Sequence, residues 1–458
     1  MIMTQEVNNT NAVKATGETA VKATNTTVNF RQLPPALRAT LKPYPEDFHM
    51  PILVGLMPAL AALADGVTYE YCSGKEHHMD LFAFIKGEQG DNKSVIDDVV
   101  ELWIAPLRKE DEIVRAQEDA AAKQNRTRKA NERGQQAPEG CVRIVPITIS
   151  VAKLLQRQIN GKGHSLYSIE SEADTLLKTN GAGSWSAKYD IYRKSWDHAL
   201  FGQDFMSLNS QSGNIRAFYS WTICGQTCSF LKLFGNENAS NGLSSRTMIA
   251  EMPDNSFRKM PKFKKMTDND LDIIEEGIQK LRMATGFKAT PRLKKAIDDW
   301  QEEKRLEAAQ AVDRIKDIYR RRAAVIGYRC GVIFMLLVGK ESNACVDFAL
   351  TMAEYTLQNQ CRLFGPLLKM QTEKVNDRMP VATVNKNILQ QLPSPFSLED
   401  LRQLKGSDCS DGSLYSIISR WKAEGWIEKT GKNSWEKTPS LKTLQSCNLA
   451  VTDKDSEE

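Results

Sequence analysis

The sequence lacks the features of a membrane protein, a secreted disulfide scaffold or a zinc ribbon. Its nine cysteines include no Cys-x-x-Cys pair, which argues against a thioredoxin-like redox motif or a paired-cysteine zinc site. The longest apolar run, residues 51–64, is shorter than the ~18 residues that a membrane span needs. The first residues lack a basic-then-apolar signal. We therefore expect a reducing, cytoplasmic location without membrane attachment.

The chain also has little net charge and no extreme composition. Hydrophobic residues make up 41% and charged residues 26% of its 458 positions, with a formal net charge of +4. These values are typical of soluble globular proteins and exclude a histone-like basic protein. A nucleic-acid-binding surface would therefore have to be local. The length predicts about two to four domains.

Changes in composition and periodicity divide the chain into successive parts. The first residues repeat AVKAT among Thr and Asn and contain almost no large apolar side chain, so we expect them to be disordered. Later runs alternate between β-rich and helical patterns, become entirely helical, and end in helix, helix and two short strands, the order of a small winged helix. The predicted parts are a disordered tail (1–29), an α/β core (30–255) with a charged helical insertion (106–140), a helical domain (256–375), a winged-helix domain (376–443) and a polar tail (444–458).

Five short β-rich runs alternate with helical patterns in the predicted core. This alternation is typical of an α/β fold with a mainly parallel sheet. The runs are VTYEYC (67–72), LFAFI (81–85), HSLYSI (164–169), FYSWTIC (218–224) and RTMIAEM (246–252).

The stretch GEQGDNKS, residues 87–94, has the order of parts found in a phosphate-binding P-loop. An apolar strand leads into a Gly-rich turn, and a helical pattern follows. In such a loop the backbone N–H groups and the helix dipole attract phosphate, the lysine reaches the outer phosphates and the hydroxyl binds magnesium. We therefore expect Lys93 to bind phosphate and Ser94 to bind Mg²⁺. The residues predicted to bind ATP are Gly87, Gly90, Asp91, Asn92, Lys93 and Ser94.

Asn92 stands where glycine is expected before the lysine of the loop. If this position needs a positive φ, asparagine is among the non-glycine residues best suited to it. The substitution leaves open whether the loop hydrolyses ATP or binds it with little turnover. An ordinary Gly-rich turn without nucleotide is the third alternative.

Two carboxylates follow the predicted strand at 164–169. A nucleoside triphosphatase needs an acid at the end of a neighbouring strand to hold magnesium and orient water. Glu170 and Glu172 are the candidates, and they would share one face if the strand continued past Glu170. We expect one of them, provisionally Glu170, to bind Mg²⁺ together with Ser94. The alternative is that Ser171 caps a helix with acids in its first turn.

Two further strand ends offer residues for triphosphate chemistry. Gln226 and Thr227 follow the strand at 218–224, where polar side chains could sense a γ-phosphate. Arg246 is the first residue of the run at 246–252, just before its apolar part, and could stabilise transition-state charge on a neighbouring subunit's triphosphate. An ordinary surface ion pair is the alternative for this arginine.

Candidate nucleic-acid contacts lie in two segments. In FRKMPKFKK (257–265) basic residues alternate with Phe257 and Phe263, which could stack or pack; a solvated linker is the alternative. The predicted winged helix has eight basic and seven acidic residues between positions 395 and 443, so DNA reading and protein docking both stay open. The candidate nucleic-acid contacts are Arg258, Lys259, Lys262, Lys264, Lys265, Arg420, Lys422 and Lys432.

The order of these motifs resembles domain of unknown function 3987, a helicase-like P-loop ATPase family of phages, plasmids and conjugative elements. GEQGDNKS, SIESEADTL, SWTICGQTCSFLKLFG, GLSSRTMIAEMP and YRRRAAVIGYR carry the resemblance, over about residues 30–370. It implies a RecA- or AAA-like core that forms a homo-oligomeric ring and uses ATP and Mg²⁺ to move on DNA. Because no primase domain precedes the core, a separate primase is an expected partner.

We therefore expect an ATP-dependent, helicase-like DNA motor for replication of a mobile genetic element. The alternative is a nucleotide-gated DNA-binding adaptor or initiator with little or no hydrolysis.

Overall fold

The computed structural model describes two compact units, which divide after Leu368. The residues that it describes are 27–71, 74–126, 140–174, 184–203, 213–235, 242–370, 388–389, 391–405, 410–423, 425–431 and 433–438. Lys432, one of the predicted nucleic-acid contacts, lies outside the described residues, as do the predicted tails apart from residues 27–29.

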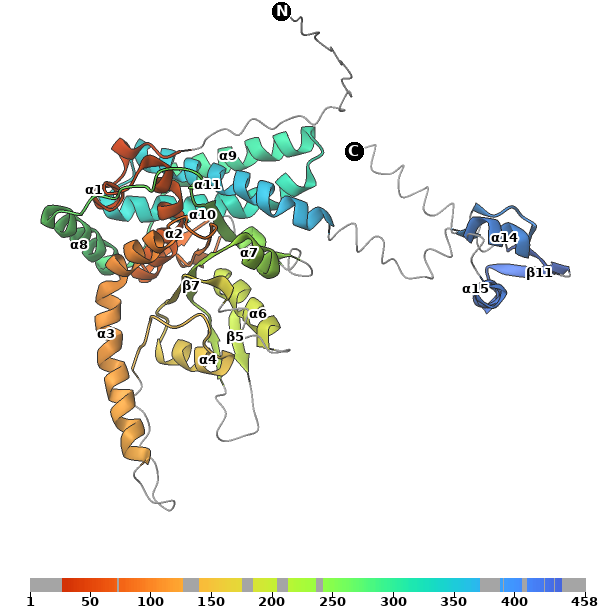
Figure 1. Ribbon diagram of the computed structural model, residues 1–458, viewed down its shortest axis with the longest axis horizontal. Coiled ribbons are helices and arrows are strands. Elements are labelled where there is room, and N and C mark those ends of the chain that lie inside the picture. The colour runs from red at the N-terminus through yellow and green to blue at the C-terminus, as the bar shows by residue number, and fades with distance from the viewer. Residues whose placement is uncertain are drawn as a thin grey trace, which may run out of the picture. The chain divides into compact units, whose positions relative to one another are not determined.

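A four-stranded parallel sheet lies at the centre of the first unit (Figure 1). Its strand order is β4-β7-β3-β8, and each neighbouring pair is parallel. The predicted α/β architecture with a parallel sheet is thus confirmed. The strands are β3 (Phe82–Lys86), β4 (Leu166–Glu170), β7 (Tyr219–Gly225) and β8 (Thr247–Glu251).

The fifth predicted strand lies outside this sheet. β1 (Val67–Glu70) pairs antiparallel with β2 (Glu76–His77) and parallel with β9 (Gly286–Phe287). Buried and half-buried residues alternate along β1, whereas β7 is buried along its whole length. A strand inside a parallel sheet is covered on both faces and is therefore buried along its whole length, as β7 is and β1 is not. β5 (Leu200–Gln203) and β6 (Gly213–Arg216) form a separate antiparallel pair.

Helices pack around the sheet, and the most apolar of them, α2 (His49–Leu63), is a core helix. In the described part of the chain, the segment Glu46–Leu63, which is η2 (Glu46–Phe48) followed by α2, is long and apolar enough to cross a membrane by length and composition, but 83% of it is buried inside the protein. The other helices of the first unit are η1 (Phe30–Gln32), α1 (Pro35–Leu41), η2 (Glu46–Phe48), α3 (Ser94–Arg126), α4 (Val151–Asn160), α6 (Ser184–Trp196), α7 (Thr227–Phe234), η4 (Ser244–Arg246), α8 (Asp268–Met283), α9 (Pro291–Gln310), α10 (Arg314–Val338) and α11 (Asn343–Leu363).

The ranges predicted as an α/β core and as a helical domain share one hydrophobic core. Ile85 and Trp221 from the sheet belong to the same buried cluster as Ile278, Leu293 and Phe348 from the later helices. The first range and the second range up to Leu368 lie in one unit.

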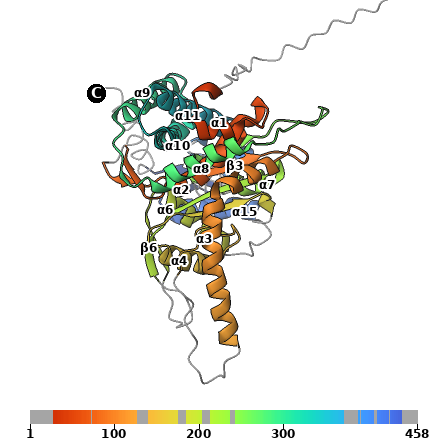
Figure 2. The same cartoon turned by 90° about the vertical axis from the view of Figure 1, so that its left-hand side faces the viewer.

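The helix that follows the loop is longer than predicted. The expected loop helix and the first part of the insertion at 106–140 form the continuous helix α3, with Pro106 inside it. Its C-terminal half extends away from the sheet (Figure 2). The charged surface predicted for the insertion agrees with the exposure of most residues from Lys109 to Arg126.

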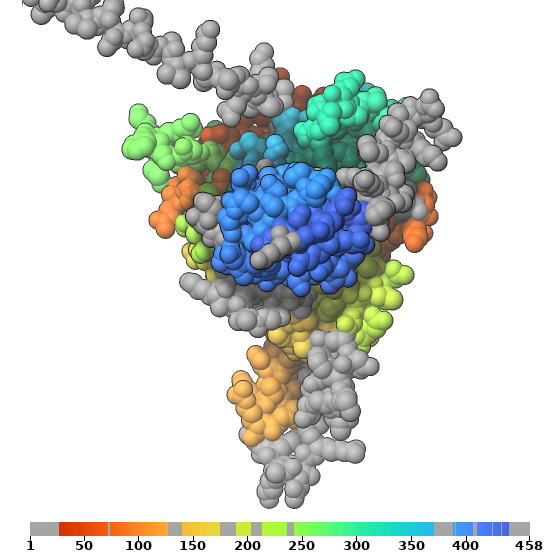
Figure 3. Space-filling view, turned by 90° about the vertical axis from the view of Figure 1, so that its right-hand side faces the viewer, coloured from red at the N-terminus to blue at the C-terminus, as the bar shows by residue number. Residues whose placement is uncertain are grey.

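The second unit is a small α/β unit with its own core, drawn in blue in Figure 3. Its antiparallel sheet has the order β10-β12-β11, and Leu414, Ile418, Trp421 and Trp435 are buried in its core. Its elements are β10 (Phe396–Ser397), α14 (Leu398–Lys405), α15 (Asp411–Ala423), β11 (Ile427–Gly431) and β12 (Ser434–Lys437). The expected order of two helices and two strands is present.

Candidate phosphate-binding site

The loop at residues 87–94 lies at the carboxyl edge of the parallel sheet. Lys86, the last residue of β3, is level with Gly225 of β7 and Glu251 of β8. In the sheet, β4 and β7 lie on one side of β3, and β8 lies on the other side. The strand order therefore reverses at β3. Ligands of open parallel sheets bind outside the carboxyl ends of the strands where the strand order reverses in this way.

The loop backbone adopts left-handed conformations at two positions. Gly90 has a φ of 89° and Asn92 a φ of 56°. The position before the lysine therefore does need a positive φ, the condition under which asparagine can replace glycine. Gly87 is also required by space, since a Cβ there would lie 2.9 Å from Met252 Cγ.

This conformation leaves hydrogen-bond donors of the loop without partners. The backbone N–H groups of Gly90, Asn92, Lys93 and Ser94 donate to no other residue in the described part of the chain. The Nδ2 atom of Asn92 is buried and also lacks a hydrogen-bond partner there. Consecutive unpaired N–H groups at the start of a helix form a concavity that attracts anions.

The lysine of the loop holds the turn closed. The Lys93 Nζ donates to the carbonyl oxygens of Gly87, at 2.8 Å, and Glu88, at 2.6 Å. A phosphate in the loop would offer the ammonium group a charged acceptor in place of these neutral carbonyls, which makes a stronger hydrogen bond.

Asp91 has a structural part in the loop. Its Oδ2 accepts the Glu88 N–H at 2.6 Å, and its Oδ1 accepts the Asn255 N–H at 3.4 Å. The Asp91 side chain therefore shapes the turn and joins it to the segment after β8, so its effect on a bound phosphate would be indirect.

Of the two predicted acids, only Glu170 belongs to a strand of the sheet. β4 ends at Glu170, so the alternation that would place Glu172 on the same face does not continue. Glu172 is exposed, and its N–H donates to Glu170 Oε1 at 3.2 Å. Burial raises the pKa of Glu170, and the Glu172 carboxylate raises it further.

Asp97, which was not predicted from the sequence, lies next to this acid. It is one turn after Ser94 on α3, and its side chain shares a hydrogen bond with Ser171. Burial raises the pKa of Asp97 to about 6 against that hydrogen bond, and the neighbouring carboxylates, including Glu170, raise it further. The spacing of three between Ser94 and Asp97 was the available signal, since such residues share a helix face.

The buried Cys224 thiol lies among these charges. Burial raises its pKa, Asp97 and Glu170 raise it further, and Lys93 lowers it. The charges of Lys93, Asp97 and Glu170 thus all act on this thiol, near the end of β7.

The predicted sensor residues also lie at this edge. The N–H of Thr227, at the start of α7, donates to Glu88 Oε1 at 3.2 Å, and its hydroxyl donates to the same oxygen. The hydrogen bond from Thr227 lowers the pKa of Glu88. Gln226, the N-cap residue of α7, makes no side-chain capping bond. The structure thus brings Thr227 to the loop through Glu88, a residue that was not singled out from the sequence.

Arg246 lies at the opposite edge of the sheet. It precedes β8, whose first residue Thr247 pairs with the first residue of β3. The Arg246 Nη2 donates to Asp197 Oδ2 at 2.7 Å, and Arg322 binds the other oxygen of Asp197 at 3.0 Å. The side chain is 12% exposed. Within one chain Arg246 is therefore an ion-pair residue and does not meet the loop.

The predicted nucleic-acid contacts fall in both units. Those between Arg258 and Lys265 follow β8 and are exposed. In the second unit Arg420 and Lys422 are exposed on α15.

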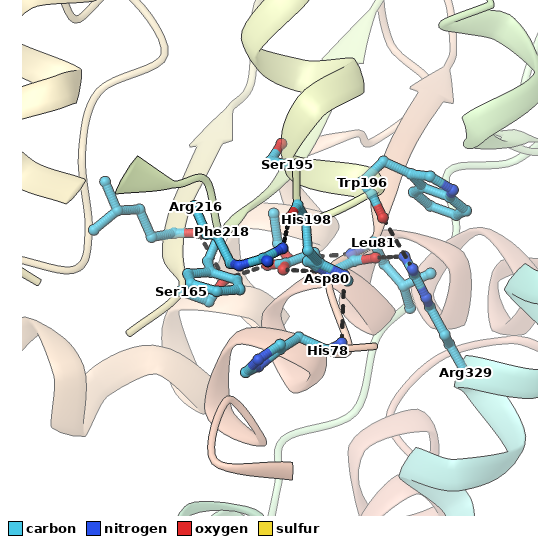
Figure 4. Close-up of polar contacts among 12 residues, drawn as sticks. His78, Asp80, Leu81, Ser165, Ser195, Trp196, His198, Arg216, Phe218 and Arg329 are labelled. Atoms are coloured by element: carbon cyan, nitrogen blue, oxygen red, sulfur yellow. Dashed lines mark hydrogen bonds and ion pairs between the residues drawn. The ribbon is translucent and has the colours of Figure 1, made fainter. Parts of the chain in front are cut away.

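A second polar cluster, also not predicted from the sequence, lies at the amino edge of the sheet (Figure 4). The buried Asp80 carboxylate accepts from His198 Nε2 at 3.0 Å, from Ser220 Oγ at 3.2 Å and from Ser165 Oγ. Arg329 donates to the Asp80 carbonyl oxygen and to Trp196 O. Because each serine donates to the aspartate and not to the histidine, this cluster ties the starts of strands together and provides no activated nucleophile.

No group of three or more His, Cys, Asp and Glu side chains in the described ranges could hold a metal ion by itself.

Comparison with known proteins adds no identification. No protein-family model matches the chain, and no curated protein matches it either.

Proposed function

We propose that the first unit is a RecA- or AAA-like P-loop ATPase that binds MgATP in the loop at residues 87–94. The observation that carries this proposal is the loop itself. Four backbone N–H groups and the Asn92 amide lack partners in the described part of the chain, beside Lys93 and at the switch point of a parallel sheet. A buried donor without a partner costs about 1–3 kcal/mol, and a bound phosphate would offer the Asn92 amide an acceptor.

Each group at the site has a role that its position supports. The loop N–H groups and Lys93 would bind the phosphates, and Ser94 with Glu170 would hold magnesium, which neutralises phosphate charge. Glu170 is preferred over Glu172 because it ends β4 and because its charge, like that of Lys93, acts on the Cys224 thiol. Gln226 and Thr227 would sense the outer phosphate from the end of β7.

The proposal extends to a homo-oligomeric ring. Arg246 is at the edge of the sheet opposite the loop, so only a neighbouring copy of the chain could bring it to a triphosphate. For this it would have to leave Asp197.

Together with the resemblance to domain of unknown function 3987, these features support an ATP-dependent, helicase-like motor on DNA for replication of a mobile element. The second unit would be a winged helix that reads DNA through α15, where Arg420 and Lys422 are exposed.

The test is phosphate release from ATP and Mg²⁺, with and without single-stranded DNA. The wild type is expected to hydrolyse ATP faster with DNA, and Lys93→Ala to lose turnover by about 100-fold or more, as expected for loss of a group that stabilises transition-state charge. Lys232→Ala, an exposed lysine on α7, is the matched control and should behave as wild type. Turnover that ignores DNA would contradict the motor.

Asn92→Gly distinguishes the motor from a nucleotide-gated adaptor. If the wild type is silent and Asn92→Gly restores hydrolysis, the loop binds nucleotide with little turnover, and the adaptor replaces the motor. A motor requires that wild type and Asn92→Gly both hydrolyse ATP.

A further inference from the structure

Residues 253–266 form an extended arm between β8 and α8. The arm contains no helix or strand, and it extends away from the body of the first unit, as the green segment in Figure 2 shows. It begins at the same edge of the sheet as the phosphate-binding loop, because β8 ends level with β3.

The arm is strongly basic and its charges are available. It has five basic residues and one acidic residue, Asp254. All five basic side chains are exposed, and none of them forms an ion pair with a residue in the described ranges. Most basic residues of the neighbouring helix α10 do have acidic partners, for example Arg320 and Arg321 with Asp317. The arm therefore presents uncompensated positive charge.

The two phenylalanines of the arm differ in their surroundings. Phe263 packs edge-on against Tyr44 and Phe48, with ring centroids 5.3 and 5.4 Å apart, and is part of the fold. Phe257 is fully exposed and has a φ of 60°. A left-handed backbone conformation is unfavourable for a bulky residue such as Phe257. Neither this conformation nor the exposure of the ring stabilises the fold. Met260 is also 70% exposed.

Both ends of the arm are fixed. At the first end Met252 N donates to Lys86 O at 2.7 Å, and Asn255 N donates to Asp91 of the loop. At the other end Lys264 N donates to Pro43 O at 2.9 Å. The arm is therefore fixed at its first end to the phosphate-binding loop and at its other end to the segment between α1 and η2.

We propose that this arm binds single-stranded nucleic acid, with its lysines and arginine on the phosphates and Phe257 stacked on a base. Free cations combined with an exposed aromatic ring match a single strand, whose bases are accessible to stacking, better than a duplex. An anionic membrane fits less well, because the arm is extended and not an amphipathic helix. The inference rests on the proposed function, since it names the surface through which the motor would hold its track.

The experiment measures binding of a fluorescent oligothymidylate to the full chain by anisotropy, without nucleotide and over a range of salt concentrations. The arm variant is Arg258→Gln/Lys259→Gln/Lys262→Gln. The control removes the same charge elsewhere through Lys109→Gln/Lys232→Gln/Lys280→Gln, three exposed lysines without ion pairs in the described ranges. Thermal unfolding checks that both variants fold.

The arm variant is expected to bind at least about tenfold more weakly than the control. Its salt slope should be smaller by about 2, because each phosphate that a cation neutralises on a single strand contributes ~0.7 to the slope. Phe257→Ala should lose about tenfold on the single strand and little on a duplex.

Equal affinity of the arm and control variants would overturn the inference. An equal effect of Phe257→Ala on single strand and duplex would also overturn it, as would binding to anionic vesicles alone. Because nucleotide is omitted, these outcomes do not depend on whether the loop binds ATP.

Discussion

Asn92 shows how a residue type can predict a backbone conformation. Asparagine could replace glycine before the lysine only if that position allowed a positive φ, and the structure has 56° there. A single residue can indicate such a backbone conformation because the tolerance of asparagine for the left-handed region is a local property of its side chain.

The Asp80 cluster could not be predicted because its members are far apart in the sequence. Asp80 and His198 are separated by 118 positions and meet only when the strands align. Burial alone would raise the pKa of Asp80, but the hydrogen bonds from His198 and Ser165 lower it. His198 Nε2 faces this carboxylate, and its Nδ1 accepts the His78 N–H at 3.4 Å. The imidazole is therefore neutral, with its proton on Nε2.

This arrangement predicts acid sensitivity of the fold. Burial lowers the pKa of His198 to about 4, so between that pH and about 6.5 the unfolded chain binds more protons than the folded one. The free energy of unfolding should therefore fall by about 3 kcal/mol as the pH falls across this window. This contribution should be fully present above about pH 6.5. Urea unfolding at a series of pH values measures it.

His198→Gln is the matched variant for that prediction, because its amide can still donate to Asp80 but does not titrate. Its loss of stability between the same pH values should be smaller than that of the wild type. Parallel pH profiles for the two proteins would show that His198 does not titrate as described.

At the scale of elements, the strands of the parallel sheet were predictable because they are continuous apolar runs. β1 was placed in the wrong sheet because its pairing with β9, more than 200 residues later, leaves no local signal. The continuity of α3 was missed for a related reason. Its charged second half was interpreted as an insertion. In the structure, Asp111 joins this half to the segment before β4 by accepting the Arg143 and Ile144 N–H groups at 2.8 and 2.6 Å.

Asp111 should therefore be needed for the stability of this element. Asp111→Ala would leave two backbone donors unpaired, one of them on the buried Ile144, and is expected to cost about 2–3 kcal/mol of unfolding free energy. Asp119→Ala, an exposed acid on the same helix, should change it by less than about 0.5 kcal/mol. Chemical denaturation of the three proteins makes the comparison, and an equal effect of both substitutions would contradict the role given to Asp111.

At the scale of the whole molecule, the order of the segments along the chain could be predicted from the sequence. That the α/β part and the later helices share one core could not. The sequence indicated an α/β part followed by helices, but the helices complete the core around α2 and the sheet. This packing depends on which apolar faces of the helices and the sheet contact one another. The hydrophobic periodicity of the sequence indicates that such faces exist, but not which of them pair. The second unit has its own core, as its separate hydrophobic pattern indicated.

The proposed function depends on one property of the first unit, namely that the loop at 87–94 binds a nucleoside triphosphate. The direct measurement is equilibrium titration of the full chain with a fluorescent ATP analogue and Mg²⁺, for wild type, Lys93→Ala and the control Lys232→Ala. We predict saturable binding by the wild type, with the control unchanged. Lys93→Ala should bind about tenfold or more weakly, as expected when a charge-assisted hydrogen bond to phosphate is removed. Absence of binding by the wild type, or equal binding by wild type and Lys93→Ala, would contradict it.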